Sequence, residues 1–210
     1  MDITLILVVL TAIISVYAWS NPTFLDKWIL SPFLVAKRQE YYRFLTSGFL
    51  HADWMHLLFN MFAFFSFGQL VQGGFEQIFG LEGGLWRYLL LYLGGIIASD
   101  IPTYLRHRQD PDYRSLGASG GVASIIFSGI LFYPLNKIGI FPLPQQFGIP
   151  GFIFGFLYLG YSYYMGRRSG DNINHDAHFY GALYGVVLTL VFIPQIGPYF
   201  IQQIQQYLFK

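Results

Sequence analysis

The chain has 210 residues, of which 54% are apolar and only 11% are charged, whereas an ordinary soluble domain carries about 25% charged residues. The formal net charge is +1 and no phosphate-binding glycine motif occurs, so nucleic acid is not an expected partner. The absence of cysteine excludes disulfides and thiol chemistry. Composition therefore favours an integral membrane protein whose surroundings are the lipid bilayer.

The acidic and basic residues are absent from long blocks of the chain. These blocks lie between Asp2 and Asp26, Asp53 and Glu76, Arg114 and Lys137, Lys137 and Arg167, and Asp176 and Lys210. An α-helix needs about 20 apolar residues to cross about 30 Å of hydrocarbon. The pattern predicts one all-α, multi-pass membrane domain over residues 1–210, a six-helix bundle with spans near 3–20, 54–75, 85–105, 115–134, 150–166 and 177–193.

The segments between these spans differ in character. Residues Ile3 to Trp19 lack a basic n-region and a cleavage site, which favours a retained first span over a signal peptide. The first loop, Asn21 to Leu50, is too apolar for a solvated linker and is expected in the membrane interface. The residues from Gly166 to Asn174 read as a polar cap, and 199–209 as a candidate interfacial helix.

Three of the predicted spans begin with polar side chains that a hydrolase uses. His51, His56 and Asn60 stand at the entry to the second span, and Ser119 at the entry to the fourth. His178 stands at the entry to the sixth. Because successive spans cross the bilayer in alternate directions, these three entries share one side of the membrane. A nucleophile, a base and an amide donor are therefore expected to meet.

Ser119 is the candidate nucleophile, within the sequence Gly117-Ala-Ser119-Gly120-Gly121. A serine hydroxyl needs a nearby base and donors for the oxyanion. The flanking glycines allow close backbone approach, and a helix beginning near Gly117 would present unpaired N–H groups to the serine. The competing interpretation is that this small-residue pattern only serves helix packing.

His178 is the better candidate base. Gly181 and Gly185 follow it at i+3 and i+7, which puts the imidazole and two close-approach positions on one helix face. His175 lies one turn earlier and stays a second candidate. Asp176 does not share the face of His178, because residues two apart diverge on a helix. The sequence therefore favours a Ser–His dyad over a triad.

His56 and Asn60 are spaced i, i+4 and project from one face of the second span. A side-chain amide that faces a reacting carbonyl donates to the developing negative charge. The competing interpretation is that Asn60 only bonds a neighbouring helix.

At these residues the chain resembles the rhomboid family of intramembrane serine proteases. The family's motifs are a histidine-rich entry to the second span that ends in asparagine, Gly-x-Ser-Gly in the fourth span, and Ala-His-x-x-Gly-x-x-x-Gly in the sixth. In this sequence they read His51-Ala-Asp-Trp-Met-His56-Leu-Leu-Phe-Asn60, Gly117-Ala-Ser119-Gly120 and Ala177-His178-Phe-Tyr-Gly181-Ala-Leu-Tyr-Gly185.

The resemblance implies six helices, Ser119 as nucleophile and His178 as its base, and no metal or cofactor. It also implies an oxyanion site made by His56, Asn60 and the Ser119 amide. The substrates would be transmembrane helices of other proteins, cut near their outer ends, with the fifth span and the polar cap acting as a gate. A multi-pass protein of the bacterial inner membrane is the expected setting.

Two departures from the family's pattern limit this transfer. Tyr42-Arg43 stands where many relatives have Trp-Arg, so that motif carries over mainly through Arg43. The Glu-xxx-Gly that often closes the second span appears late, as Glu76 to Gly80. Neither departure touches the dyad.

Three other interpretations account for parts of the sequence. The Gly-x-Ser-x-Gly elbow of α/β-hydrolases needs a strand before the serine, whereas residues 106–114 are polar and contain proline. A metalloprotease would use the histidines, but no His-Glu-xx-His occurs. A non-proteolytic rhomboid-like membrane chaperone is the strongest competitor, although such chains usually lack the serine or the histidine.

The charge distribution and the family resemblance predict opposite orientations in the membrane. Of the twelve Lys and Arg residues, Arg87, Lys137 and Lys210 fall on the side of the termini, and the other nine fall on the side of the candidate site. The positive-inside rule would place those nine in the cytoplasm. The resemblance instead places the termini there and the site toward the exterior, and this second orientation is the one we expect.

Overall fold

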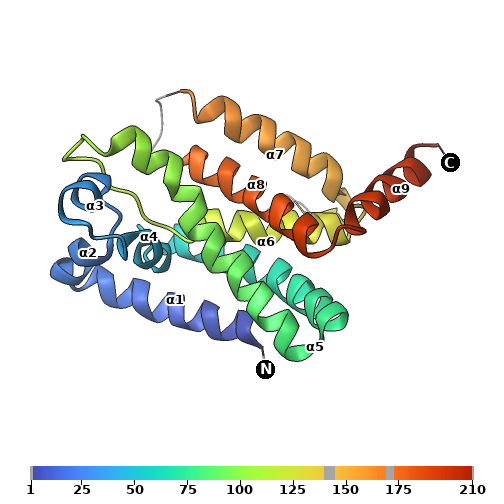
Figure 1. Ribbon diagram of the computed structural model, residues 1–210, viewed down its shortest axis with the longest axis horizontal. Helices are drawn as coiled ribbons and strands as arrows, with labels where there is room; N and C mark the ends of the chain where they lie inside the picture. Colours follow the sequence, from blue (N-terminus) through green and yellow to red (C-terminus); the bar gives the residue numbers. More distant parts are fainter. Residues whose placement is uncertain (1, 140–144, 169–172, 210) are drawn as a thin grey trace.

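The computed structural model describes residues 2–139, 145–168 and 173–209, and most of these residues are helical (Figure 1). The α-helices are α1 (Ile3–Trp19), α2 (Pro22–Trp28), α3 (Pro32–Arg38), α4 (Arg43–Thr46), α5 (Trp54–His107), α6 (Ser119–Phe132), α7 (Gly151–Met165), α8 (His175–Phe192) and α9 (Ile196–Leu208). Two short 3₁₀ turns, η1 (Ser47–Phe49) and η2 (Gln145–Phe147), and a two-stranded antiparallel pair, β1 (Lys137–Ile138) with β2 (Ile149–Pro150), complete the list. The predicted helical class is confirmed, and the small strand pair is an addition to it.

Helix α5 holds the predicted second and third spans. We expected a turn over residues 76–84, but the helix is interrupted only at Gly80, whose φ of 72° and ψ of 172° are non-helical. The two halves fold back on each other there. This is shown by the ring of Phe64 in the first half, which stacks on that of Tyr92 in the second with centroids 4.1 Å apart. The expectation of a longer turn was wrong because Gly83 and Gly84 keep helical backbone and serve close packing instead. A Cβ on Gly84 would lie 2.6 Å from the backbone nitrogen of Glu76.

Fewer helices than predicted are long and apolar enough to cross a bilayer. Within the part of the chain that the structure describes, α5 is the one helix long and apolar enough to cross a bilayer. Helices α8 and α9, bent by 110°, meet the test only if they count as a single span. Helices α1 and α6 are apolar but shorter. The number of six spans therefore stays a prediction.

Helix α6 lies at the centre of the structure, between α5 and α8 (Figure 1). All of its residues are buried except Ser119 and Ile126. We expected this helix to begin at residue 115, but it begins at Ser119. Ser115 is extended instead, because its backbone pairs with Leu30 of the first loop through hydrogen bonds of 3.0 and 3.1 Å. The start of α6 is thereby fixed to the first loop.

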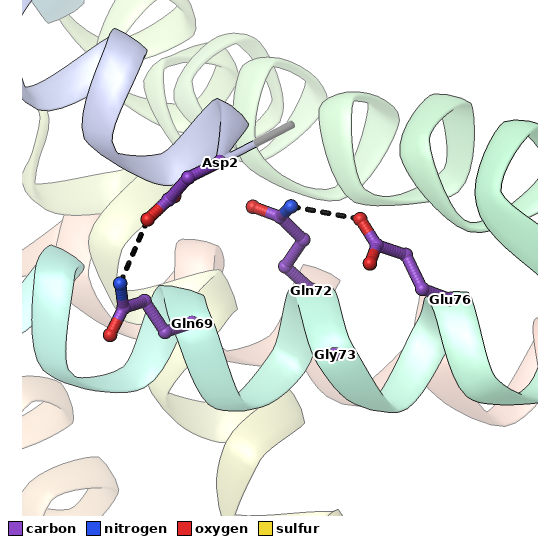
Figure 2. Close-up of a pocket in the computed structure, with 5 residues that line it drawn as sticks. All are labelled: Asp2, Gln69, Gln72, Gly73 and Glu76. Atoms are coloured by element: carbon purple, nitrogen blue, oxygen red, sulfur yellow. Dashed lines mark hydrogen bonds between the residues drawn. The ribbon is translucent and has the colours of Figure 1, made fainter.

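Helix α1 is fastened to α5 by polar contacts near its N-terminus. Figure 2 shows a hollow there, in which Gln69 donates to Asp2 at 2.9 Å and Gln72 donates to Glu76 at 2.8 Å. The carbonyl oxygen of the Gln72 side chain also accepts from the Thr4 hydroxyl at 3.0 Å. Glu76, which comes late in the second span, therefore holds the Gln72 side chain that bonds α1.

The expected first loop is folded rather than extended. It contains α2, α3 and α4, and the buried side chain of Arg43 ties them together. Arg43 donates to the carbonyl oxygens of Asp26 at 2.6 Å and Ile29 at 2.8 Å, and it forms an ion pair with Glu40. Because the buried Arg43 side chain is hydrogen-bonded to carbonyl oxygens and paired with a carboxylate, it holds this loop in a fixed fold beside the start of α6.

Candidate active site

Gly117 sets the backbone turn that leads into α6. Its φ of 130° lies in a region that residues with a Cβ rarely adopt. Its N–H donates to the carbonyl oxygen of Ser47 at 3.0 Å. A Cβ at this position would stand 2.9 Å from Cε1 and 3.0 Å from Nε2 of His56. Both the backbone conformation and the approach of the His56 ring therefore require glycine.

Ser119 is the first residue of α6 and is partly exposed, between the buried Ala118 and Gly120. The preceding Ala118 provides no side-chain cap. The N–H groups in the first turn of a helix have no intrahelical acceptor, and the helix dipole makes this end positive. Negative charge that develops on an atom beside Ser119 would be stabilised by these groups.

Helix α8 presses directly on α6 at two glycines. A Cβ on Gly181 would lie 2.2 Å from the carbonyl oxygen of Gly120, and one on Gly185 would lie 2.3 Å from that of Ser124. Real Cβ atoms do not approach backbone so closely, so a side chain at either position would push the helices apart. Because Gly181 touches the residue that follows Ser119, the turn of α8 before Gly181 lies at the Ser119 end of α6.

His178 stands in that turn, three residues before Gly181. Its ring stacks on that of Tyr158 from α7, with centroids 6.0 Å apart and an interplanar angle of 24°. The ring of His175 meets it edge-on at 5.9 Å and also contacts Tyr161 of α7 at 5.5 Å. Helix α7 therefore covers both histidines of α8 with aromatic rings.

The N-terminus of α8 differs from the expectation. The helix begins at His175, two residues earlier than predicted, because Asn174 caps it by accepting from the Ala177 N–H at 3.1 Å. Asp176 is turned to the periphery, where it forms an ion pair with Arg106 of α5. Residues 169–172, within the segment predicted to be a cap, lie outside the described residues.

Asn174 is a positioning residue that our sequence reasoning missed. Its side-chain amide nitrogen donates to the hydroxyls of Thr103 at 3.1 Å and Ser115 at 3.2 Å. One side chain thus joins the second half of α5, the segment before Ser119 and the helix that carries His178. The signal was present as an asparagine directly before the first histidine of the sixth span, where helix N-caps are found.

The histidine-rich entry to α5 forms a second polar layer. Asp53 caps α5 by accepting from the His56 N–H at 2.8 Å, and the Asn60 amide donates to the His56 carbonyl oxygen at 2.9 Å. The Ala52 N–H approaches Nδ1 of His56 at 3.4 Å. With Nδ1 as acceptor, the proton of a neutral His56 is on Nε2, the atom that faces Gly117.

His51 supports His56 from behind and is fully buried. Its Nδ1 lies 3.0 Å from the Ser15 hydroxyl, and its carbonyl oxygen accepts from the Trp19 indole at 2.7 Å. The rings of His51 and His56 meet edge-on at 4.9 Å. Burial, together with the nearby His56, lowers the pKa of His51 to about 3, so this ring is neutral at physiological pH.

The two non-rhomboid interpretations find no support in this geometry. Residues 106–118 hold no strand before Ser119 other than the single bridge to Leu30. No group of three or more His, Cys, Asp or Glu side chains that could hold a metal ion occurs within residues 2–139, 145–168 and 173–209.

Comparison with known proteins identifies a family. The model of the Rhomboid domain matches residues 38–195. Rhomboid-like protein 11, chloroplastic, of Arabidopsis thaliana is 32% identical over 179 residues, which cover 77% of this chain and 56% of the relative. Rhomboid-related protein 1 of Caenorhabditis elegans is 28% identical over 81% of this chain and 45% of its own length. YdcA, a rhomboid protein of Bacillus subtilis (strain 168), is 30% identical over 72% of this chain and 67% of its own length. The chain spans about half the length of the first two relatives.

The network around Asn174 generates a prediction about stability. Asn174→Ala removes the cap of α8 and both hydroxyl contacts, and loss of an N-cap alone costs about 1 kcal/mol. Asn174→Asp keeps a capping acceptor but loses the amide donor. We expect the unfolding midpoint in detergent to fall for both variants and to fall further for alanine. Equal midpoints for the wild type and Asn174→Ala would contradict this role.

Proposed function

The chain belongs to the rhomboid family, and on this basis we propose that it is an intramembrane serine endopeptidase that cleaves transmembrane helices of membrane-protein substrates with a Ser–His dyad. The observation that carries the proposal is the position of Ser119. It begins α6 beside Gly117, which the His56 ring contacts, and beside Gly120, on which the turn after His178 presses. Nucleophile, base and oxyanion donors thereby come from three different spans.

In the proposed reaction, the Ser119 hydroxyl oxygen attacks the carbonyl carbon of the scissile peptide bond while His178 takes the hydroxyl proton. His178 then gives this proton to the leaving amine, and an acyl-enzyme remains on Ser119. Water, deprotonated by His178, releases the new carboxylate and restores the serine. Neutral His178 is the form that accepts the proton.

Negative charge on the carbonyl oxygen would be stabilised by three groups. These are the Ser119 N–H at the positive end of α6, the Nε2–H of His56 and the amide of Asn60. His51 supports this assignment, because a neutral, buried ring behind His56 adds no competing charge. Asn60 uses one of its N–H groups for the His56 carbonyl and keeps a second for the substrate.

The proposed architecture is a single rhomboid domain with six spans. The two halves of α5 supply the second and third spans, and α1, α6, α7 and α8 supply the others. Helices α6 and α7 have 14 and 15 residues, which at about 1.5 Å per residue is less than a 30 Å hydrocarbon core. The site at the head of a short α6 would then lie below the membrane surface, where transmembrane substrates are reached.

The first prediction on function concerns the nucleophile. Purified Ser119→Ala should give no cleavage of a model transmembrane substrate in detergent, with an unfolding midpoint close to the wild type because loss of one hydroxyl leaves little cavity. Ser66→Ala is the control, since Ser66 is exposed and only bonds the Phe62 carbonyl of its own helix. Cleavage by Ser119→Ala would refute the dyad. A wild type without cleavage would favour the chaperone alternative.

The two histidines of α8 are separated by the next prediction. His178→Ala should lower kcat as far as Ser119→Ala does, and the double variant should be little worse than either, because members of a dyad act as a unit. His175→Ala should retain activity within about tenfold of the wild type, since it would act only on the packing of His178. The opposite ranking would assign the base to His175.

Oxyanion stabilisation predicts a turnover defect rather than a binding defect. His56→Ala should lower kcat by about 10²-fold or more, as loss of one such donor does elsewhere, with little change in KM. Asn60→Ala should act in the same direction and less strongly, because part of its donor capacity is already used by His56. Variants that raise KM and leave kcat unchanged would indicate a purely structural role.

We propose that the protein lies in a bacterial plasma membrane with its site toward the exterior and its termini in the cytoplasm. The natural chain has no cysteine, so single cysteines can report on sidedness. A membrane-impermeant maleimide should label Asp112→Cys, near the site, in intact cells. It should label Glu82→Cys, exposed at the hairpin of α5, only after permeabilisation. The reverse pattern would overturn the orientation and leave the chemistry untouched.

A further inference from the structure

A second polar hollow lies at the same end of the molecule as Ser119, between the first loop and the end of α5. It has a volume of about 290 Å³ and is lined by Ala36, Lys37, Tyr104, Arg108 and Gln109. The side chains that line it are exposed except for that of Tyr104. The Tyr104 ring meets that of Phe44 in α4 edge-on, with ring centroids 5.5 Å apart. The hollow therefore joins α3 and α4 to α5 through polar groups open to the surroundings.

Among the residues that the structure describes, its two cations differ from Arg38, Arg43 and Arg106 in having no acidic partner. Arg38 and Arg43 pair with Glu40, and Arg106 pairs with Asp176. No ion pair joins Lys37 or Arg108 to a carboxylate anywhere in the described segments of the chain. Two cations on one hollow, with a phenol and an amide beside them, create a positive field that an anion would relieve.

An apolar row leads away from this hollow along α5. Ile97, Ile101 and Leu105 are exposed and spaced four residues apart, so they lie on one helix face. Arg108 and Tyr104 continue that face, each three residues beyond a member of the row. Ile97 and Leu105 stand eight residues apart, which is about 12 Å of helix and approaches the depth of one hydrocarbon leaflet. A ligand with a phosphate at one end and a hydrocarbon chain at the other matches both parts.

We propose that this hollow binds the headgroup phosphate of an anionic phospholipid, with one acyl chain along Ile97, Ile101 and Leu105. Lys37 and Arg108 would bind the phosphate from α3 and α5, and Tyr104 and Gln109 would donate to its oxygens. The lipid would bridge the first loop to the second half of α5. A free phosphate would leave the apolar row unused, and an acidic peptide would match only the charges.

The test uses the full chain in phosphatidylcholine-containing detergent micelles, with native mass spectrometry to count retained phosphatidylglycerol. Lys37→Gln/Arg108→Gln should weaken phosphatidylglycerol binding by about thirtyfold, the effect of two cations at an anionic lipid surface. The control is Arg167→Gln/Arg168→Gln. It removes the same charge from the same side, where the guanidinium groups lie over the rings of Tyr163 and Tyr164 at 4.1 and 4.4 Å, closer than Lys37 lies over that of Phe33 at 6.0 Å. The control should bind phosphatidylglycerol as the wild type does.

The apolar row and the rival ligands are tested in parallel. Ile101→Ser/Leu105→Ser should lower phosphatidylglycerol retention, and inorganic phosphate should not displace the lipid. Equal losses in both charge variants, or full displacement by inorganic phosphate, would overturn the proposal. So would unchanged lipid binding in Lys37→Gln/Arg108→Gln together with slower cleavage of a substrate that has an acidic flank, since this assigns the hollow to substrate. Unfolding midpoints without lipid confirm that each variant is folded.

Discussion

The close approach of α8 to α6 is the constraint on which the rest of the structure depends. Gly181 and Gly185 bring the backbone of one helix onto the carbonyl oxygens of Gly120 and Ser124 in the other, which no larger residue permits. In a bilayer there is little hydrophobic gain from helix association, so close van der Waals packing of small residues supplies much of the stabilisation. The same contact determines where the first turn of α8 meets the head of α6. Helix packing and the geometry of the candidate site thus rest on one pair of glycines.

Around this contact, polar groups are arranged so that each element at the site has a second attachment. The start of α6 is tied to the first loop by the Leu30–Ser115 bridge and by the Gly117–Ser47 hydrogen bond. The start of α8 is tied to α5 and to the same segment through Asn174. Partly buried polar groups that are satisfied in this way rigidify a site, because breaking one of these bonds leaves a donor or acceptor that is shielded from water. A rigid frame around Ser119 suits a reaction that needs donors aimed at one oxygen atom.

The sequence was most informative where chemistry requires particular residue types at particular spacings. The helical class and the shared side of the Ser119 and His178 entries followed from charge-free blocks and helical periodicity. The boundaries of the helices were predicted less well from the sequence. Ser115 was assigned to a helix although it pairs with Leu30, a partner 85 residues away in the chain, and such tertiary pairing has no local signature. A turn was expected over residues 76–84, which include Gly80, Gly83 and Gly84, but of these three only Gly80 has a positive φ. Composition does not distinguish a glycine that bends the backbone from one that allows close helix packing.

The central claim is that Ser119 is an activated nucleophile, and its reactivity toward a fluorophosphonate tests this most directly. Such a reagent forms a covalent bond with a serine oxygen only where a base and oxyanion donors assist the attack. The account predicts that the detergent-solubilised wild type gains one adduct, located by mass spectrometry on the peptide that contains Ser119, and that Ser119→Ala gains none. An adduct on a different serine, or equal labelling of wild type and Ser119→Ala, would contradict the account.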